Sequence, residues 1–261
     1  MNSLILRRFS TVTFAALILL GVATPSRAAT AITWDVSTIT ADTDVITTGS
    51  LVSAVRIGTD GYPGPAGNVT VNGVTFVPGL YSSNPISQGA FDLSFYGSNS
   101  SYDNAVPLYG VPLGDLLSQG VNEQGLDVGQ LTVNGLTTGN DYKLQVFSFL
   151  GDYNNPAGVN GSFIKFDPST AGYTGSGSTS VNGQFLIASF TASSPSLTLD
   201  WSVNNAGGLK QAAINAIQLR DVSIVPEPTQ MVSVAAIGSA LGMWRMRKLR
   251  RNGRGSNATA C

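Results

Sequence analysis

Residues 131–148 read LTVNGLTTGNDYKLQVFS, and this stretch decides the fold class. It contains two runs of β-forming residues separated by Asn, Gly and Thr, which is typical of two strands joined by a turn-rich segment. In the second run Tyr142, Leu144 and Val146 alternate with other residues, and towards Phe149 both faces become apolar. A strand with two apolar faces is buried on both sides, as at the centre of a β-sandwich.

The same kind of pattern extends from residue 29 to residue 222, where short β-rich runs are separated by Gly, Asn, Pro and Ser. The predicted strands are 31–34, 51–57, 69–71, 74–76, 91–95, 129–133, 142–149, 163–166, 184–191, 196–201 and 212–219. Helical patterning is scarce, and one short helix or turn is expected at 113–117 (LGDLL). The sequence therefore predicts an all-β fold, a single sandwich domain over residues 29–222.

Turns are signalled by the triplet Val-Asn-Gly, which occurs at 71–73, 133–135 and 181–183. Asn-Gly tolerates positive φ and suits the type I′ turns of β-hairpins. The spacings between the three copies differ, so the triplet indicates turn chemistry and not a repeat architecture. Segments 97–104, 151–161 and 172–183 are rich in Gly, Asn and Ser and are expected to be exposed loops.

Composition excludes several functions. Charged residues make up 11% of the chain, against about 25% in an average protein. The region from Asp35 to Asp221 holds 14 acidic and 5 basic residues, a net charge of −9, which disfavours nucleic-acid binding. The absence of His excludes His-based triads and His metal sites, and the single Cys excludes an internal disulfide and zinc-thiolate clusters.

Residues 1–28 predict a secretory signal peptide. The pair Arg7-Arg8 precedes an apolar run at 12–22, and small residues follow. We expect cleavage after Ala28, with Ala31 as the alternative, and the competing interpretation is a buried core helix. Because Phe9-Ser10 departs from the twin-arginine motif, export by the Sec route is favoured.

Residues 223–251 predict a sorting and anchoring segment. Residues 229–244, TQMVSVAAIGSALGMW, carry no charge and are near the lower length limit for one transmembrane helix. A basic cluster follows, which should stay cytoplasmic and place the acidic middle outside, with residues 252–261 as a cytoplasmic tail. The cluster consists of Arg245, Arg247, Lys248, Arg250 and Arg251.

The order of Pro226-Glu227-Pro228, one short span and an Arg-rich cluster resembles the PEP-CTERM sorting domain. The resemblance implies cleavage near Pro226, Glu227 and Pro228 by an exosortase, a membrane-embedded transpeptidase-like enzyme. The two prolines agree with this, because they hold the backbone extended just outside the membrane. The alternative is a permanent membrane anchor in which the triplet is accidental.

The middle region resembles known domains more weakly. Residues 131–148 and the last strand, AAINAIQLRDV at 212–222, are similar to strands of galactose-binding-like β-sandwich domains. The opening from Ile32, ITWDVSTITADTD, looks like extracellular domains that accompany PEP-CTERM tails. This resemblance covers most of residues 31–222 and implies a jelly-roll sandwich and, distantly, sugar binding.

No catalytic residues are predicted. Glu123 is the only glutamate before the tail and is expected in a Gly-flanked loop near Asp115 and Asp127, where the spacing selects no acid pair for glycoside hydrolysis. We therefore expect a protein that is not an enzyme and has no cofactor, apart from a candidate structural calcium held by loop aspartates, since Ca²⁺ prefers carboxylate oxygens. Those aspartates are Asp42, Asp44, Asp60, Asp103, Asp152 and Asp167, and the alternative is an acidic surface without a site.

Carbohydrate contact is the remaining candidate, because sugars stack on aromatic rings and bond to Asn and Asp side chains. Tyrosines in or beside the Gly/Ser/Asn-rich segments are Tyr62, Tyr81, Tyr96, Tyr102, Tyr109, Tyr153 and Tyr173. The tentative contacts are Tyr102 with Asp103 and Tyr153 with Asn154. Packing of a loop on the sandwich is the favoured alternative for each tyrosine, and Trp34 and Trp201 are predicted to be core residues.

Together these features predict an exported, non-catalytic protein that an exosortase processes and that associates with exopolysaccharide at the cell surface or in the extracellular matrix. Before processing it would be a single-pass inner-membrane precursor. One alternative is a membrane-anchored adhesive protein that contacts other proteins through strand edges or loops. The other is a polysaccharide-processing enzyme that works without His.

Overall fold

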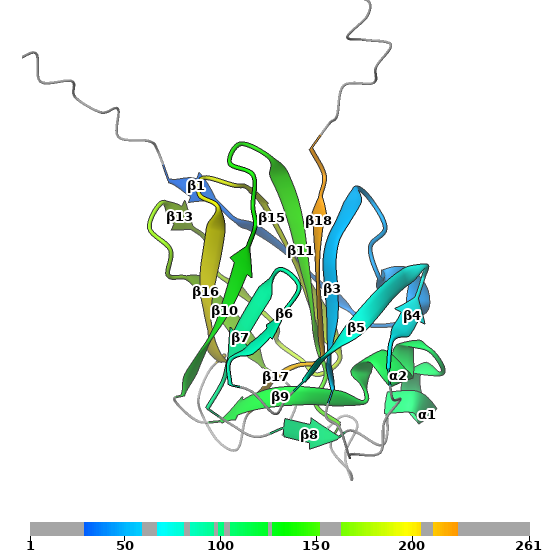
Figure 1. Cartoon of the computed structure of the whole chain (residues 1–261). Helices are drawn as coiled ribbons and strands as arrows, with labels where there is room; N and C mark the ends of the chain where they lie inside the picture. Colours follow the sequence, from blue (N-terminus) through cyan, green and yellow to red (C-terminus); the bar gives the residue numbers. More distant parts are fainter. Residues whose placement is uncertain are drawn as a thin grey trace, which may run out of the picture.

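The structure is a computed structural model that describes residues 29–58, 67–80, 84–96, 99–101, 105–124, 127–151, 163–204 and 211–223. Within these ranges two large β-sheets face each other, and two short helices and a smaller sheet lie at one end (Figure 1). The all-β sandwich is therefore confirmed. The described residues contain no helix long and apolar enough to span a membrane. The predicted signal and transmembrane helices lie outside the described residues.

The larger sheet has seven strands, all antiparallel except the parallel pair β3–β5. Its order is β2 (Thr33–Thr38), β15 (Gln184–Thr191), β11 (Asp141–Ser148), β18 (Ala216–Asp221), β3 (Ser50–Gly58), β5 (Val74–Leu80) and β4 (Val69–Val71).

The facing sheet has six strands, in the order β14 (Gly177–Ser178), β12 (Ile164–Pro168), β16 (Ser196–Val203), β10 (Val128–Asn134), β7 (Phe91–Ser94) and β6 (Ile86–Gln88). A three-stranded sheet consists of β17 (Gln211–Ile214), β9 (Gln119–Gln124) and β8 (Asn99–Ser101). β1 (Thr30–Ala31) pairs in parallel with β13 (Tyr173–Thr174). The helical elements are η1 (Asp42–Asp44), α1 (Ala105–Tyr109) and α2 (Leu113–Leu117).

The segment 131–148 joins the two large sheets. Leu131 and Val133 lie on β10 in the smaller of them, and Leu144 and Val146 lie on β11 in the larger. All four side chains are buried in one core, together with the fully buried Trp201. Alternation in both strands therefore points one apolar face of each sheet at the other, which is what a sandwich requires.

A second core covers the outer face of the seven-stranded sheet. Phe147 and Phe185 point to this face and pack under residues of the helices, among them Leu113 and Leu116. This explains why β11 is apolar on both faces near its end: each face has its own core.

A polar clamp holds the segment 44–49 across the same outer face, and we define it as Gln145, Gln218 and Arg220. Gln145 accepts a hydrogen bond from the Ile46 amide at 3.1 Å and donates to the Asp44 carbonyl at 2.7 Å. The Arg220 guanidinium donates to the carbonyls of Thr47, Thr48 and Gly49 at 2.8–2.9 Å. Burial lowers the pKa of Arg220, and these carbonyl dipoles compensate the buried charge.

Several strand predictions need correction. The run 212–219 is not one strand, because it breaks at Asn215 into β17 and β18. Strands β6, β8, β9, β13 and β14 were not predicted, and three of them lie in segments expected to be loops. The short helix at 113–117 is confirmed as α2. Trp201 is core as predicted, but Trp34 is only half-buried, stacked on Phe166 at a ring-centroid distance of 5.6 Å.

The three Val-Asn-Gly triplets adopt different roles. Asn72 and Gly73, with φ of 47° and 75°, form the two-residue turn of the β4–β5 hairpin, as a type I′ turn requires. The triplets at 133–135 and 181–183 instead lie where the chain passes from the six-stranded to the seven-stranded sheet. The same residues thus signal a turn without specifying which strands it joins.

Replacing Arg220 by Ala should lower the free energy of unfolding of the full chain by about 3 kcal/mol, because charge-assisted bonds to buried carbonyls are lost. Equilibrium denaturation of the purified protein measures this. Lys143→Ala is the control, since Lys143 is the register partner of Arg220 on β11 and is half-buried. A loss no larger than that of the control would contradict a stabilising role for the clamp.

Candidate functional site

The sandwich has two chemically different ends. At the terminal end, which we define by Thr30, Asn140 and Asp221, the first described strand, β1, begins and the last one, β18, ends (Figure 1). Asp221 accepts hydrogen bonds from Asn140 and Ser223. Burial opposes ionisation of this carboxyl, but the hydrogen bonds prevail and lower its pKa.

The loop end is opposite, and we define it by the strands β8, β9 and β17 with Tyr96 and the α1–α2 pair. Figure 1 shows these elements gathered at the end of the sandwich away from β1 and β13. Several polar side chains are buried at this end: Arg56, Gln119, Asn122, Glu123 and Asn215. Buried polar groups need partners, so each one fixes some part of the chain.

Asn215 is the central residue of this end. It lies between β17 and β18, where the chain leaves the three-stranded sheet and enters the seven-stranded one. Its side chain accepts from the Phe149 amide at 2.6 Å and donates to the carbonyls of Leu117 and Gln119, both at 3.0 Å. One amide group thus ties together the end of β11, the end of α2 and the start of β9.

Glu123 lies in strand β9 and is fully buried, so its expected position in an exposed loop is wrong. Its Oε1 accepts a hydrogen bond of 2.7 Å from the backbone amide of Tyr96. Its neighbours in sequence include Asn122, which is also buried and donates to the Gln211 side chain. The strand was missed because polar residues rarely signal burial.

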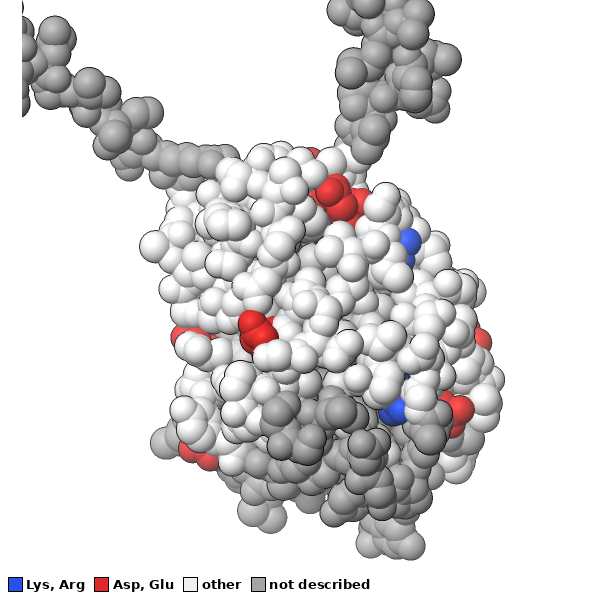
Figure 2. Space-filling model, in the orientation of Figure 1, with Lys and Arg blue, Asp and Glu red and all other residues white. Residues whose placement is uncertain are grey.

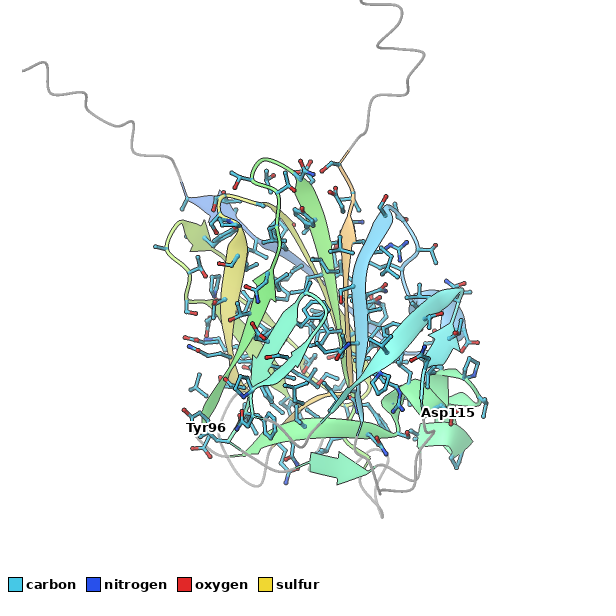
Figure 3. The ribbon with its side chains drawn as sticks, viewed as in Figure 1. Tyr96 and Asp115 are labelled. Atoms are coloured by element: carbon cyan, nitrogen blue, oxygen red, sulfur yellow. The ribbon has the colours of Figure 1, made fainter. Side chains whose placement is uncertain are left out.

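Arg56 performs a similar anchoring role on β3. The guanidinium donates from Nε and Nη2 to the Gly67 carbonyl at 2.9 and 2.7 Å. Gly58 lies beneath it: a β-carbon there would come within 2.8 Å of the Arg56 Nη1 and 3.2 Å of the Gln119 Oε1. Burial lowers the pKa of Arg56, while the charge of Asp115 on α2 acts in the opposite direction (Figure 3).

The structure separates the tyrosines of the polar segments. Tyr173 is buried, with its hydroxyl accepting from the Ser193 amide, and Tyr109 packs edge-on against Phe149. Burial raises the pKa of the Tyr109 hydroxyl. For both residues the packing alternative is confirmed. Tyr96 differs, because its side chain is 74% exposed at the loop end (Figure 3).

The tentative sugar contacts Tyr102, Asp103, Tyr153 and Asn154 lie outside the described residues, and so do Tyr62 and Tyr81. The same holds for the cleavage position Ala28 and for the whole sorting segment, including Pro226, Glu227, Pro228 and the basic cluster. These assignments stay predictions. Tyr102 and Asp103 lie in the sequence between β8 and α1, and Tyr153 and Asn154 lie between β11 and β12. The flanking ends of these four elements are at the loop end.

Two of the three described aspartates of the calcium hypothesis, Asp44 and Asp167, bind other groups of the protein. The Asp44 carboxylate accepts from the amides of Thr40 and Ala41 at 2.6 and 2.9 Å and so stabilises η1. Burial opposes ionisation of Asp167, but hydrogen bonds from Lys165 and Ser176 outweigh it and lower the pKa. No metal-binding group of three acidic, His or Cys side chains occurs in the described part of the chain. Asp60, Asp103 and Asp152 lie outside it.

Surface charge is sparse. On the face shown in Figure 2, acidic groups occur singly or as small groups on a mostly uncharged surface, with few basic groups. The described residues on this face form no basic patch that would bind phosphate backbones. One shallow hollow of about 260 Å³ lies at the terminal end and is lined by residues including Thr33, Ser189 and Val222.

No family model and no curated protein matches the chain. Solved structures match in part. The ANX1 ectodomain from Arabidopsis thaliana is 8% identical (TM-score 0.42; 66% of this chain, 42% of that one). The plant receptor-like kinase FER is 12% identical (TM-score 0.40; 65% and 48%). The CBM51-2 structure in complex with GlcNAc and INT domains from Clostridium perfringens ZmpB is 13% identical (TM-score 0.30; 72% and 48%). The chain spans less than half the length of these structures, and likeness at this level supports no statement about ligands.

Replacing Asn215 by Asp tests the anchoring role at constant side-chain shape. The variant loses both donors and turns carboxylate oxygens towards two carbonyls, so the free energy of unfolding should fall by about 3 kcal/mol at neutral pH. Chemical denaturation of the full chain measures the loss. The deficit relative to the native chain should shrink at acidic pH, where a neutral carboxyl regains one donor. An unchanged stability at both pH values would rule out the role.

The calcium hypothesis predicts a higher Tm in calcium than in chelator, because a ligand that binds only the folded state stabilises it. Joint replacement of Asp60, Asp103 and Asp152 by Asn should abolish the difference. Asp35→Asn, at an exposed position on β2, is the control. Equal Tm values for the native chain in both buffers would refute the site.

Proposed function

We propose that the chain is an exported, non-catalytic domain that binds exopolysaccharide through its loop end after processing by an exosortase. The observation that supports this most is the placement of its ends. β1 begins and β18 ends at the terminal end, opposite Tyr96 and the buried anchors (Figures 1 and 3). A domain held by its C-terminal segment would therefore present the loop end outward.

The chemistry of the loop end favours binding over catalysis. Glu123 is fully buried and bound to a main-chain amide, so it is not presented to a sugar as an acid or nucleophile. The groups around it fix loops in place, which is what a recognition surface needs. The proposal accordingly includes no enzymatic step and no cofactor, with calcium retained as a structural hypothesis.

The finer fold assignment is part of the same proposal. We infer a jelly-roll sandwich of the galactose-binding-like kind, on the strength of the two facing, mostly antiparallel sheets and the strand patterns at 131–148 and 212–222. Export would follow the Sec route with cleavage after Ala28. The precursor would then span the inner membrane once through residues 229–244, before transfer to the cell surface or matrix.

A membrane-anchored adhesive protein is the second candidate. The observation in its favour is β2, an outer strand of the seven-stranded sheet on which five of six residues are exposed, Val36 among them. Exposed strand edges can pair with another protein chain. A bound polysaccharide would not be needed in that case.

Expression of the full chain in an exopolysaccharide-producing host with an exosortase should yield a mature protein in the polysaccharide fraction. Mass spectrometry should place its first residue at Ala29 and its last near Glu227. A matched host without the exosortase should retain Arg245–Cys261 and keep the protein in the membrane.

Retention of the basic cluster in both hosts would contradict processing and favour the permanent anchor. Correct processing with no protein in the polysaccharide fraction, and none released from it by polysaccharide-degrading enzymes, would contradict binding and favour the adhesive alternative.

A further inference from the structure

Tyr96 is an exposed aromatic ring on a rigid support. Its side chain is 74% exposed, whereas the preceding residue, Phe95, is buried in the main core. The chain therefore emerges from the core and turns a tyrosine to solvent within one residue. Tyr96 lies two residues after the end of β7, so its ring contributes little to the packing of the core.

The main chain that carries the ring is held from three directions. Trp201 donates from its indole nitrogen to the Ser94 carbonyl at 3.1 Å. Asn84 donates to the Phe95 carbonyl at 2.7 Å, and its own oxygen accepts from the Phe95 amide at 3.4 Å. Glu123 accepts from the Tyr96 amide at 2.7 Å. Three consecutive residues are thus fixed by side chains from β16, from β9 and from the segment just before β6.

Rigid attachment matters for binding because ordering a mobile group on contact costs affinity. Tyrosine has only two side-chain torsions, so a fixed backbone leaves little freedom to lose when a ligand covers the ring. The structure around Tyr96 is therefore suited to a stacking contact that changes little on binding.

The side chains near the ring are mostly polar, with one apolar residue beside them. Ser94 and Gln130 are register partners on β7 and β10; Tyr96 lies two residues beyond Ser94, after the end of β7, and Val128 lies two residues before Gln130 on β10. Val128 is also exposed and would extend the apolar surface beside the ring. Across the same outer face follow Thr132 and Thr198, whose hydroxyls lie 3.0 Å apart.

Charge near the ring disfavours anionic ligands. Asp127 precedes β10, Asp92 lies two residues before Ser94 on β7, and Asp200 is the register partner of Gln130 and accepts a hydrogen bond from it. All three are acidic, and so is Glu123, which is buried behind the Tyr96 amide. Lys165 on β12 lies in the register row of Val128 and Ser202, and it is paired with Asp167. The described basic residues lie on other strands: Arg56 on β3, Lys143 on β11, Lys165 on β12 and Arg220 on β18. A polyuronate or sulfated polymer would meet repulsion here, and an uncharged one would not.

From these observations we propose that Tyr96 is a preorganised stacking platform for the apolar face of an uncharged pyranose, and that Asn84 and Glu123 are its positioning residues. This inference rests on the proposed function and narrows it to neutral polysaccharides. Aromatic rings offer sugars an apolar surface, and the adjacent hydroxyl and amide groups suit the sugar's own hydroxyls.

The test uses the purified full chain in detergent with three neutral polymers (galactomannan, dextran and mixed-linkage β-glucan) and one polyuronate, alginate. Affinity electrophoresis and calorimetry should show binding to at least one neutral polymer and weaker binding to alginate. Tyr96→Ala should weaken the neutral interaction about tenfold, while Tyr96→Phe, which keeps the ring, should stay within about threefold. Val111→Ala, at another exposed apolar residue on the α1–α2 turn, is the matched control and should bind as the native chain does.

Asn84→Ala separates positioning from contact, because it leaves the ring intact. We expect faster amide hydrogen exchange at Phe95 and Tyr96, and binding weakened by several fold. Unchanged exchange and unchanged binding would remove the positioning role.

The other outcomes are equally distinct. Native binding to a neutral polymer that Tyr96→Ala leaves intact would overturn the platform and leave the proposed function standing. Stronger native binding to alginate would overturn the neutral specificity. Native binding to none of the four polymers would overturn the polysaccharide function itself, and this inference with it.

Discussion

The need to satisfy buried main-chain groups where two sheets diverge shapes this domain. At Asn215 the chain stops pairing in the three-stranded sheet and begins pairing in the seven-stranded one, so neighbouring amide and carbonyl groups lack ladder partners. The Asn215 side chain supplies one acceptor and two donor contacts at that point. A side-chain amide offers two donor hydrogens and an acceptor oxygen without charge. The position of β9, and through Glu123 the main chain at Tyr96, follows from this junction.

The same solution recurs elsewhere in the molecule. On the outer face of the large sheet, Gln145 and Arg220 hold a segment that has no strand partner of its own. At the loop end Arg56 holds Gly67, and Asn182 holds Leu150 through both its amide and its carbonyl. Hydrophobic burial builds the two cores, and side-chain hydrogen bonds to the backbone position what lies around them. A chain with 11% charged residues and 30 glycines depends on such contacts to order its non-repetitive parts.

The strands were predicted correctly where apolar residues alternate with polar ones, because that alternation reflects burial of one face. The prediction failed where the buried side chains are polar. The runs around Leu144 and Leu199 alternate clearly and form strands of the central core. Strand β9, with the sequence QGVNEQ, carries no such signal, because its side chains are buried by hydrogen bonding and not by apolar area. The break between β17 and β18 at Asn215 could not be predicted either, because one Asn in an apolar run does not show that its hydrogen-bond partners come from the ends of α2 and β11. The sequence does not distinguish Tyr96 from the other tyrosines; its exposure in the folded protein does. Its anchor Glu123 is 27 residues away in the chain.

The exit of the chain from β18 has a mechanical consequence. This strand is hydrogen-bonded along its length to β11 on one side and to β3 on the other, and its last residue, Asp221, lies at the terminal end. Tension between a tether beyond Asp221 and a load at the opposite end would run parallel to the strand. The interstrand bonds would then be strained together in shear, and not opened one after another as in a zipper. A domain arranged in this way resists traction best along the axis on which a surface-held protein would experience flow.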